Sequence, residues 1–348
     1  CIRDSYEHAL AVAQLDDYQP KTDLCDFLCN YGDLLRMTGR FEEAAASFRQ
    51  AAEIARDNYG GEHLQTLYPL QSMARLHCCT GDYAEAREML NRINRIHEEA
   101  EDQDHVLMLE TLNDLACAQA ALDEDDRALA TALRAEQMSR EHLLLTSRSL
   151  EAQLALRYAV SGTDGLHLAT AIAAKRAPQQ PAGLKRAFEA VIHWRALVLD
   201  ELVARTRAAR GSEDPEMAAL LTEVRLASEE LSGLTVGRMK DSAGKPATGD
   251  IEQARKRKDA AERRLAEAST AFRREQENLK LGLAEVLEAL PEDSALVAYF
   301  RYQDAICVGP GKAPLPSYLA YVITGDSEDV QAIPLGTAEE IDGLVQRW

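Results

Sequence analysis

The sequence predicts a mainly α-helical chain: an α-solenoid of helical hairpins, then a long helical hairpin, then the first strands of an incomplete α/β domain. Three observations lead to this prediction. A motif recurs every 42 residues in the first half, a helical pattern of about 40 residues follows it, and strand-like runs begin only after Pro291. Recurrence at a fixed period is typical of proteins that stack one helical unit on the next.

The recurring motif is Gly39–Ala44, with echoes at Gly81–Ala86 and Asp123–Ala128. Within the first full unit, the apolar spacing predicts one helix from Leu24 to Met37 and a second from Phe41 to about Asn58, with the turn at Gly39. Small residues are expected where the two helices approach closely, and larger ones fill the space between them: Gly32 and Ala44, then Leu28, Tyr31, Leu35, Phe41 and Phe48.

These positions resemble the tetratricopeptide repeat, in its variety with longer helices. The first unit matches at Gly32, Gly39, Phe41, Ala44, Phe48 and Ala51. The second matches at Ala74, Gly81, Tyr83 and Ala86, and the third at Leu112, Ala116, Ala128 and Ala135, with Asp123 in place of the turn glycine. A fourth unit, about Ser149 to Ala177, is degenerate and has Thr170 at the alanine position. Residues 1 to 15 are expected to be the second helix of an earlier repeat.

The resemblance implies a protein or peptide partner, bound in a groove lined by the first helix of each hairpin. The matching positions are Asp26, Cys29, Asn30, Asp33, Arg36, Tyr68, Gln71, Ser72, Arg75, Glu110, Asn113, Asp114 and Cys117. The alternative is that these residues only face water. The Lys and Asn set that clamps a C-terminal carboxylate in chaperone-binding relatives is absent, which disfavours that ligand.

The charge of the chain is strongly acidic, with a formal net charge of −19. Residues 1 to 160 hold 29 Asp and Glu against 15 Lys and Arg, so a nucleic-acid partner is disfavoured. The acidity indicates either a solvated surface or one that recruits basic partners. Seven cysteines, an odd and sparse set, favour a reducing compartment. No apolar run is long enough for a membrane span, so we expect a cytoplasmic protein; the start at Cys1 suggests a cut end.

Cysteines cluster in the repeats, at Cys25 and Cys29, at Cys78 and Cys79 beside His77, and at Cys117. They have no Cys-x-x-Cys spacing, and cysteine is a common small apolar filler in helical packing. The sequence therefore predicts neither a metal site nor a cofactor.

The middle of the chain is also predicted to be helical. Pro178 and Pro181 end the array, and helices are expected at 184–210 and 215–234, followed by a loop at 237–249. Asp250 is then expected to cap a helix that runs unbroken to Leu290, with approximately heptad spacing. An antiparallel hairpin with the 215–234 helix is favoured over an intermolecular coiled coil. The basic run Arg255–Lys258 has acidic neighbours and indicates a solvated helical face.

Strand-like runs then begin, at 295–302, 318–324 and 330–335, before a helix from Ala338 to Trp348. Three strands with open edges do not make a complete domain. The predicted organisation is a repeat array at 1–177, a helical connector at 178–290 and the beginning of an α/β domain at 291–348.

The second half resembles the caspase-like domain associated with tetratricopeptide repeats, the CHAT domain. The matching segments are Trp194–Leu202, Leu290–Phe300, Tyr318–Thr324, Ile333–Ala338 and Ile341-Asp342. This resemblance implies a cysteine-peptidase-like fold, in which a His and a Cys at successive strand ends act as base and nucleophile. Those positions are expected to lie beyond residue 348. His193, in a helix, and Cys307, in a loop, are not expected to replace them.

The sequence thus predicts a protein-interaction scaffold or regulatory region without catalytic residues of its own. The alternative is the N-terminal part of a cysteine endopeptidase whose His and Cys follow residue 348. A third class, a signalling or transcription regulator, lacks a DNA-binding motif.

Overall fold

The computed structural model describes residues 21–99, 105–146, 162–176, 180–210, 215–237, 248–268, 281–304, 315–327 and 329–348. The chain divides into two compact units, Cys1–Ala132 with Gln303–Pro316 and Leu133–Tyr302 with Ser317–Trp348.

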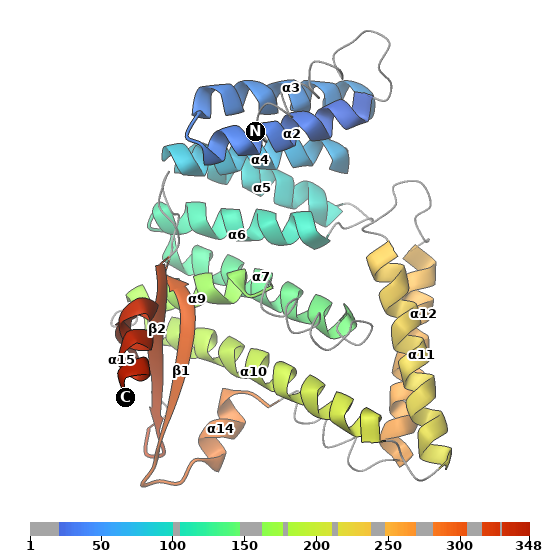
Figure 1. The fold of residues 1–348 in the computed structure, drawn as a ribbon, viewed down its shortest axis with the longest axis vertical. Helices are drawn as coiled ribbons and strands as arrows, with labels where there is room; N and C mark the ends of the chain where they lie inside the picture. Colours follow the sequence, from blue (N-terminus) through green and yellow to red (C-terminus); the bar gives the residue numbers. More distant parts are fainter. Residues whose placement is uncertain are drawn as a thin grey trace. The chain divides into compact units, whose positions relative to one another are not determined.

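The first unit is a stack of helical hairpins (Figure 1). Its helices are α2 (Lys21–Met37) and α3 (Phe41–Tyr59), α4 (Leu64–Thr80) and α5 (Tyr83–Glu99), α6 (His105–Ala121), and the turns up to Ala132 of α7 (Asp125–Thr146). The boundaries of α2 and α3 lie within three residues of the predicted ones. This confirms the prediction of a repeat array of helical hairpins.

The recurring motif marks the turn between the two helices of each hairpin. Gly39 and Gly81 have backbone φ angles of +77° and +91°, in the left-handed region that favours glycine. Asp123, at the same place in the third hairpin, has φ +59° although it carries a side chain. The turn therefore keeps its geometry where the sequence has lost the glycine.

The hairpins are held together by apolar side chains between their helices. Phe48 of α3 is fully buried and packs with Leu35, Ala44 and Leu76, and Tyr31 and Phe41 lie at the edge of this cluster. A Cβ atom on Gly32 would lie only 2.4 Å from the Phe48 ring, so this close approach of α2 to α3 requires glycine. The predicted packing of the first hairpin is confirmed.

The second unit combines helices with a small sheet. It contains the rest of α7, then α9 (Asp164–Arg176), α10 (Pro181–Arg210), α11 (Pro215–Gly237), α12 (Thr248–Ala268), α14 (Leu283–Ala289), β1 (Ala295–Asp304) up to Tyr302, β2 (Leu315–Thr324) from Ser317, β3 (Gln331–Thr337) and α15 (Ala338–Arg347). The strand order is β1–β2–β3, and β3 runs antiparallel to β2, with an irregularity between Tyr318 and Leu319. The predicted strands are present.

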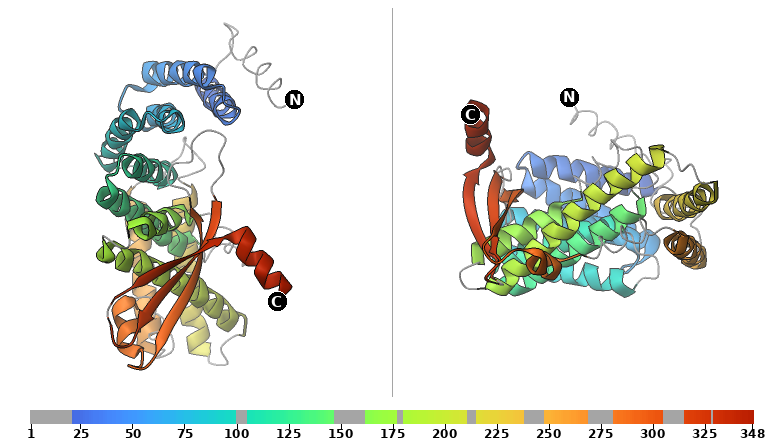
Figure 2. Two further views of the ribbon diagram at one scale, coloured as in Figure 1. Left: turned by 90° about the vertical axis from the view of Figure 1, so that its left-hand side faces the viewer. Right: turned by 90° about the horizontal axis from the view of Figure 1, so that it is seen from below.

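The sheet is anchored to two helices of its own unit, and Figure 2 shows β1 and β2 beside them. The Tyr321 ring of β2 is fully buried and stacks on Phe188 of α10, with ring centroids 4.6 Å apart. Its hydroxyl lies 3.3 Å from the Thr170 hydroxyl of α9. Thr170 stands where the repeat has alanine, and this buried hydrogen bond explains the substitution.

The predicted antiparallel hairpin is formed by α11 and α12. Arg257 of α12 pairs with Glu230 of α11 at 2.6 Å, and Arg264 of α12 pairs with Glu223 of α11 at 2.9 Å. The later residue of α12 thus contacts the earlier residue of α11, so the two helices are antiparallel. Val224, Ala261 and Leu265 form the apolar seam. The basic run also makes ion pairs, since Lys256 and Lys258 contact Glu252 and Glu262.

The prediction of an unbroken helix from Asp250 to Leu290 is wrong. Leu281 and Gly282 are not helical, and α14 begins afresh at Leu283. The Gly282 backbone is extended, and its N–H donates to the Glu285 side chain at 2.8 Å, which caps the new helix. Asp250 also lies within the first turn of α12 rather than capping it.

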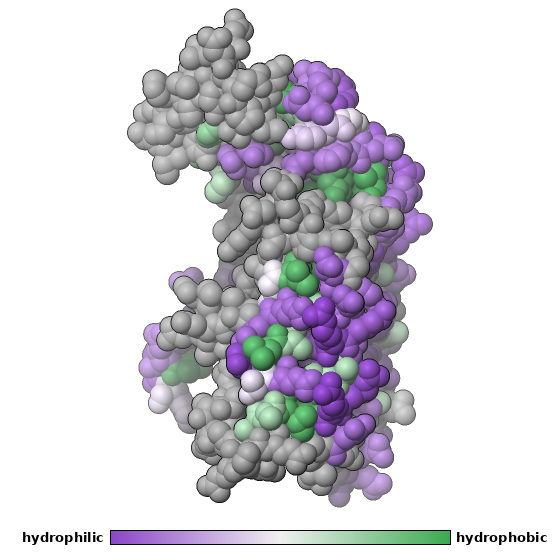
Figure 3. Space-filling view, turned by 90° about the vertical axis from the view of Figure 1, so that its right-hand side faces the viewer, coloured by the Kyte–Doolittle hydropathy of each residue, from purple (hydrophilic) through white to green (hydrophobic). Residues whose placement is uncertain are grey.

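Several predicted segments lie outside the described residues, namely residues 1–15, the first part of the degenerate fourth repeat (149–161), most of the 237–249 loop and Cys307. In the described part of the chain, no helix combines the length and apolar character needed to cross a bilayer. On the face drawn in Figure 3, the coloured residues are mainly hydrophilic, and apolar residues form small separate patches.

Candidate binding surface

The predicted site residues lie on the first helix of each hairpin, and they recur with the repeat. Asp26 of α2, Tyr68 of α4 and Glu110 of α6 are 42 residues apart, so they occupy equivalent positions in successive hairpins. Asp33 and Arg75 form a second equivalent set. On each helix these residues follow a spacing of three or four, which places them along one stripe.

Arg75 of α4 joins its own stripe to that of α6. Its guanidinium donates from Nε to Asp114 Oδ2 at 3.0 Å and from Nη2 to Glu110 Oε2 at 3.2 Å. The Gln71 amide also reaches Glu110 Oε2, at 3.5 Å. Burial alone would lower the pKa of Arg75, but its two carboxylate partners raise it. Burial raises the pKa of Asp114, which Arg75 partly offsets.

Arg36 makes a similar connection between α2 and α4. Its Nε donates to Asp33 Oδ1 at 3.0 Å, and its Nη1 lies 3.7 Å from the Cys79 sulfur at the end of α4. The side chains of Arg36 and Asp33 are only 18% and 27% exposed, so the pair is held against the helices rather than extended into water.

Tyr68 of α4 presents an aromatic ring beside these charges. The residue is 43% exposed. Burial of part of the side chain raises the pKa of its hydroxyl, and the carboxylates of Glu110 and Asp33 raise it further. Tyr68 is therefore influenced electrostatically by acidic groups of both neighbouring hairpins.

The remaining predicted residues differ in exposure. Asp26 and Asn30 are exposed, Asn113 is half-buried, and Gln71 and Ser72 are buried, at 2% and 5% exposed. Ser72 thus faces the interior of the unit rather than a partner. The helix-A face is defined here by the partly or fully exposed members: Asp26, Asn30, Asp33, Arg36, Tyr68, Arg75, Glu110, Asn113 and Asp114.

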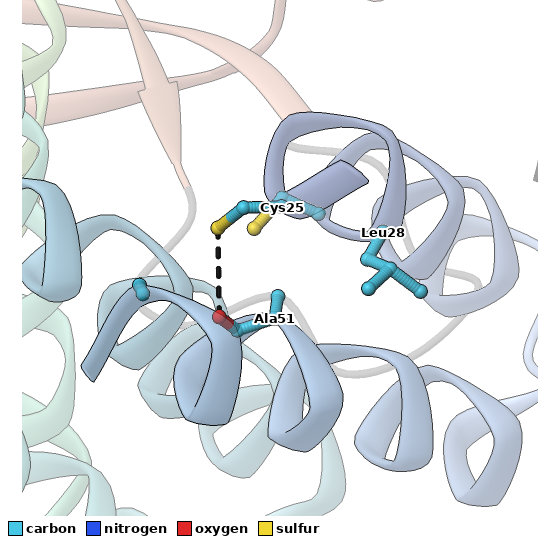
Figure 4. Close-up of a cluster of buried hydrophobic side chains, with 5 residues drawn as sticks. Cys25, Leu28 and Ala51 are labelled. Carbon is cyan, nitrogen blue, oxygen red and sulfur yellow. Dashed lines mark hydrogen bonds between the residues drawn. The ribbon is translucent and has the colours of Figure 1, made fainter. Parts of the chain in front are cut away.

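Three cysteines of the repeats, Cys25, Cys29 and Cys78, act as packing residues. Cys25 and Cys29 are buried with Leu28 and Ala51, and the Cys25 thiol donates to the Ala51 carbonyl at 3.5 Å (Figure 4). The pKa of Cys29 is raised, first by the hydrogen bond between Cys29 and Cys25 and then by burial. Burial likewise raises the pKa of Cys78. Among the described residues, no group of three or more His, Cys, Asp or Glu is placed to hold a metal ion.

The structure also contains an open polar depression, lined by α5, α6 and the beginning of α7, which was not predicted from the sequence. Glu124 is one of its lining residues and pairs with Arg87 and, at 3.5 Å, with Arg127. The only signal in the sequence is that Arg87 and Glu124 lie 37 residues apart, close to one repeat, as expected for contacts between neighbouring hairpins.

His193 lies on α10 and is half-buried, as expected for a packed helix residue. Burial lowers its pKa, as does the charge of Arg140, while the carboxylates of Glu189 and Glu285 oppose this shift.

Residues 23–99 match the tetratricopeptide repeat family. The chain contains tetratricopeptide repeats. The matched residues cover α2 to α5, the two hairpins in which the turn glycine is kept. The tetratricopeptide helices α2 and α4 therefore carry most of the helix-A face, and α6 supplies the rest. No curated protein matches the chain.

Proposed function

We propose that this tetratricopeptide protein is an interaction scaffold and that the helix-A face is where it binds a protein partner. Tetratricopeptide repeats generally mediate contacts between proteins. The observation that supports this face most strongly is the ion-pair network through which Arg75 joins α4 to α6, beside the exposed ring of Tyr68.

The network supports binding because it holds polar side chains in place before a partner arrives. Immobilising a long side chain costs roughly 0.5 to 1.5 kcal/mol when a complex forms. Arg36 and Arg75 are already fixed by their carboxylate partners, so a partner that contacts them meets a prearranged surface. Tyrosine adds a large contact area with few rotatable bonds.

The test is affinity purification from cell extract with the full chain, its Tyr68→Ala variant and the double variant Asp33→Lys with Arg75→Glu. The matched control is Glu53→Lys with Arg92→Glu, which makes the same charge changes at exposed positions of α3 and α5. We expect proteins retained by the native chain and the control to be lost from both face variants, with circular dichroism unchanged. Equal retention by all four would contradict the proposal.

We further propose that the scaffold is the regulatory region of a CHAT-type protein of the cytoplasm. The supporting observation is the order of elements, because strands follow the repeats and the α11–α12 hairpin, and Tyr321 packs that sheet on α9 and α10. The odd and sparse set of seven cysteines supports a reducing compartment.

The competing function, a cysteine endopeptidase, is separated from a scaffold by activity. We expect this chain to leave fluorogenic peptide substrates intact at every pH from about 5 to 8, the range in which a His and Cys pair is usually active. Cleavage that disappears in Cys307→Ala would favour the endopeptidase instead.

A further inference from the structure

The charges of the helix-A face indicate the chemistry of its partner. The face carries four carboxylates, Asp26, Asp33, Glu110 and Asp114, but only two guanidinium groups. Both guanidinium groups are engaged within the face, Arg36 by Asp33 and Arg75 by Asp114 and Glu110. The face therefore presents an excess of negative charge, in a chain whose net charge is −19.

In two of these carboxylates, the hydrogen bonds made within the face go to only one of the two oxygens. Within the described residues, Glu110 accepts its hydrogen bonds from Arg75 and Gln71 at Oε2, and Asp33 accepts from Arg36 at Oδ1. The Glu110 side chain is 44% exposed and that of Asp33 is 27% exposed. Glu110 Oε1 and Asp33 Oδ2, on partly exposed side chains, and the exposed side chains of Asp26 and Asn30 are therefore acceptors to which a partner can donate.

Tyr68 is 43% exposed and lies on α4, the helix that contacts both α2, which carries Asp33, and α6, which carries Glu110. The face of an aromatic ring attracts a cation, and guanidinium or ammonium groups are bound most strongly where carboxylates complete the contact. Tyr68 is also the one large apolar side chain of the helix-A face.

From this arrangement we propose that the helix-A face binds an extended protein segment rich in Lys or Arg, with one cationic side chain over the Tyr68 ring and others contacting Asp33 and Glu110. This inference rests on the proposed function and specifies the partner. Charge complementarity of this kind also speeds encounter with a basic partner and disfavours acidic ones, an effect that salt screens.

The probe that tests this is a displayed library of random peptides of about 12 residues, selected on the immobilised full chain. An extended peptide of that length spans roughly 40 Å, enough to cross three helices packed about 10 Å apart. We expect the selected peptides to be enriched in Lys and Arg over the unselected library. We also expect them to bind the Tyr68→Ala variant about ten-fold more weakly, as for loss of a cation–π contact with its buried area.

Charge variants then locate the contact. Asp33→Asn and Glu110→Gln should each weaken a selected peptide about two- to five-fold at low salt, and the difference should shrink in about 0.5 M NaCl. Glu53→Gln on α3 removes the same charge from a different helix and should leave the affinity unchanged.

The outcomes separate the two proposals. Peptides that depend on Tyr68 but carry no excess of Lys or Arg would overturn the basic partner and leave the proposed binding face in place. Peptides indifferent to Tyr68, Asp33 and Glu110, or the absence of any selected peptide, would overturn both.

Discussion

Replacing Gly32 by alanine tests how closely α2 and α3 are packed. Alanine is the better helix former by roughly 0.5 to 1 kcal/mol, so propensity alone predicts a more stable protein. The new Cβ would, however, lie 2.4, 2.7 and 2.9 Å from three carbons of the Phe48 ring. The ring cannot move away easily, because Phe48 is fully buried among Leu35, Ala44 and Leu76.

The balance of these effects favours destabilisation. Overpacking of a core costs roughly 1 to 3 kcal/mol, which exceeds the gain in propensity. We expect a net loss of about 1 to 2 kcal/mol in the free energy of opening the first hairpin. Amide hydrogen exchange, measured by mass spectrometry on peptides from α2 and α3, should therefore become about 5- to 30-fold faster.

Two further variants control this experiment. Gly233→Ala in α11 adds a Cβ with nothing within 4 Å, so exchange in α11 should slow, by the propensity effect alone. Phe48→Leu should reduce the cost of Gly32→Ala, because the smaller side chain leaves room for the new methyl group. If the amide hydrogens of α2 and α3 exchange no faster in the Gly32→Ala variant than in the native chain, the close packing of these two helices is refuted.

Four other substitutions have expected outcomes. Asp123→Gly should stabilise the third hairpin by about 1 kcal/mol, since Asp123 has φ +59°, while Gly81→Asp should cost a similar amount; thermal melts measure both. His167 packs on the sheet with its pKa lowered to about 4 by burial and by Arg301. The unfolded chain therefore binds a proton at this histidine more readily than the folded chain does, so the free energy of unfolding falls by up to about 3 kcal/mol as the pH drops from about 6.5 to 4. His167→Gln should weaken this pH dependence, measured by urea titrations at several pH values. An equal pH dependence in the native chain and the variant would contradict this expectation. Arg75→Gln leaves two partly buried carboxylates without their cation and should destabilise the second and third hairpins by about 1 to 2 kcal/mol, measured by hydrogen exchange in α4 and α6.

The repeat array could be predicted from the sequence because its signals are local. A glycine is needed where φ is positive, as at Gly39 and Gly81, and a small residue is needed opposite an aromatic one, as at Gly32. These requirements recur every 42 residues, which fixes the helix boundaries to within a few positions.

The helix break at Gly282 was missed because the apolar spacing continues across it. The structure shows a local cause for the new start of α14, since the extended Gly282 donates its N–H to the Glu285 side chain three residues later. Thr170, by contrast, looked like a degenerate repeat position until its contact with Tyr321, 151 residues away, was known.

The candidate site was predicted in part. The period placed the right helices side by side, so Arg75, Glu110 and Asp114 do meet. Helical spacing alone could not separate the exposed Tyr68 from the buried Ser72 on the same helix, because exposure depends on how the neighbouring hairpins rotate against it.

The central claim, that the helix-A face is the binding surface, is tested most directly by site-specific photo-cross-linking with a library-selected peptide. A photoreactive residue is placed at position 30 on α2, within the helix-A face, in one sample and at position 53 on α3 in another. We predict a cross-link to the peptide from position 30 and none above background from position 53. An equal or stronger cross-link from position 53 would contradict the account.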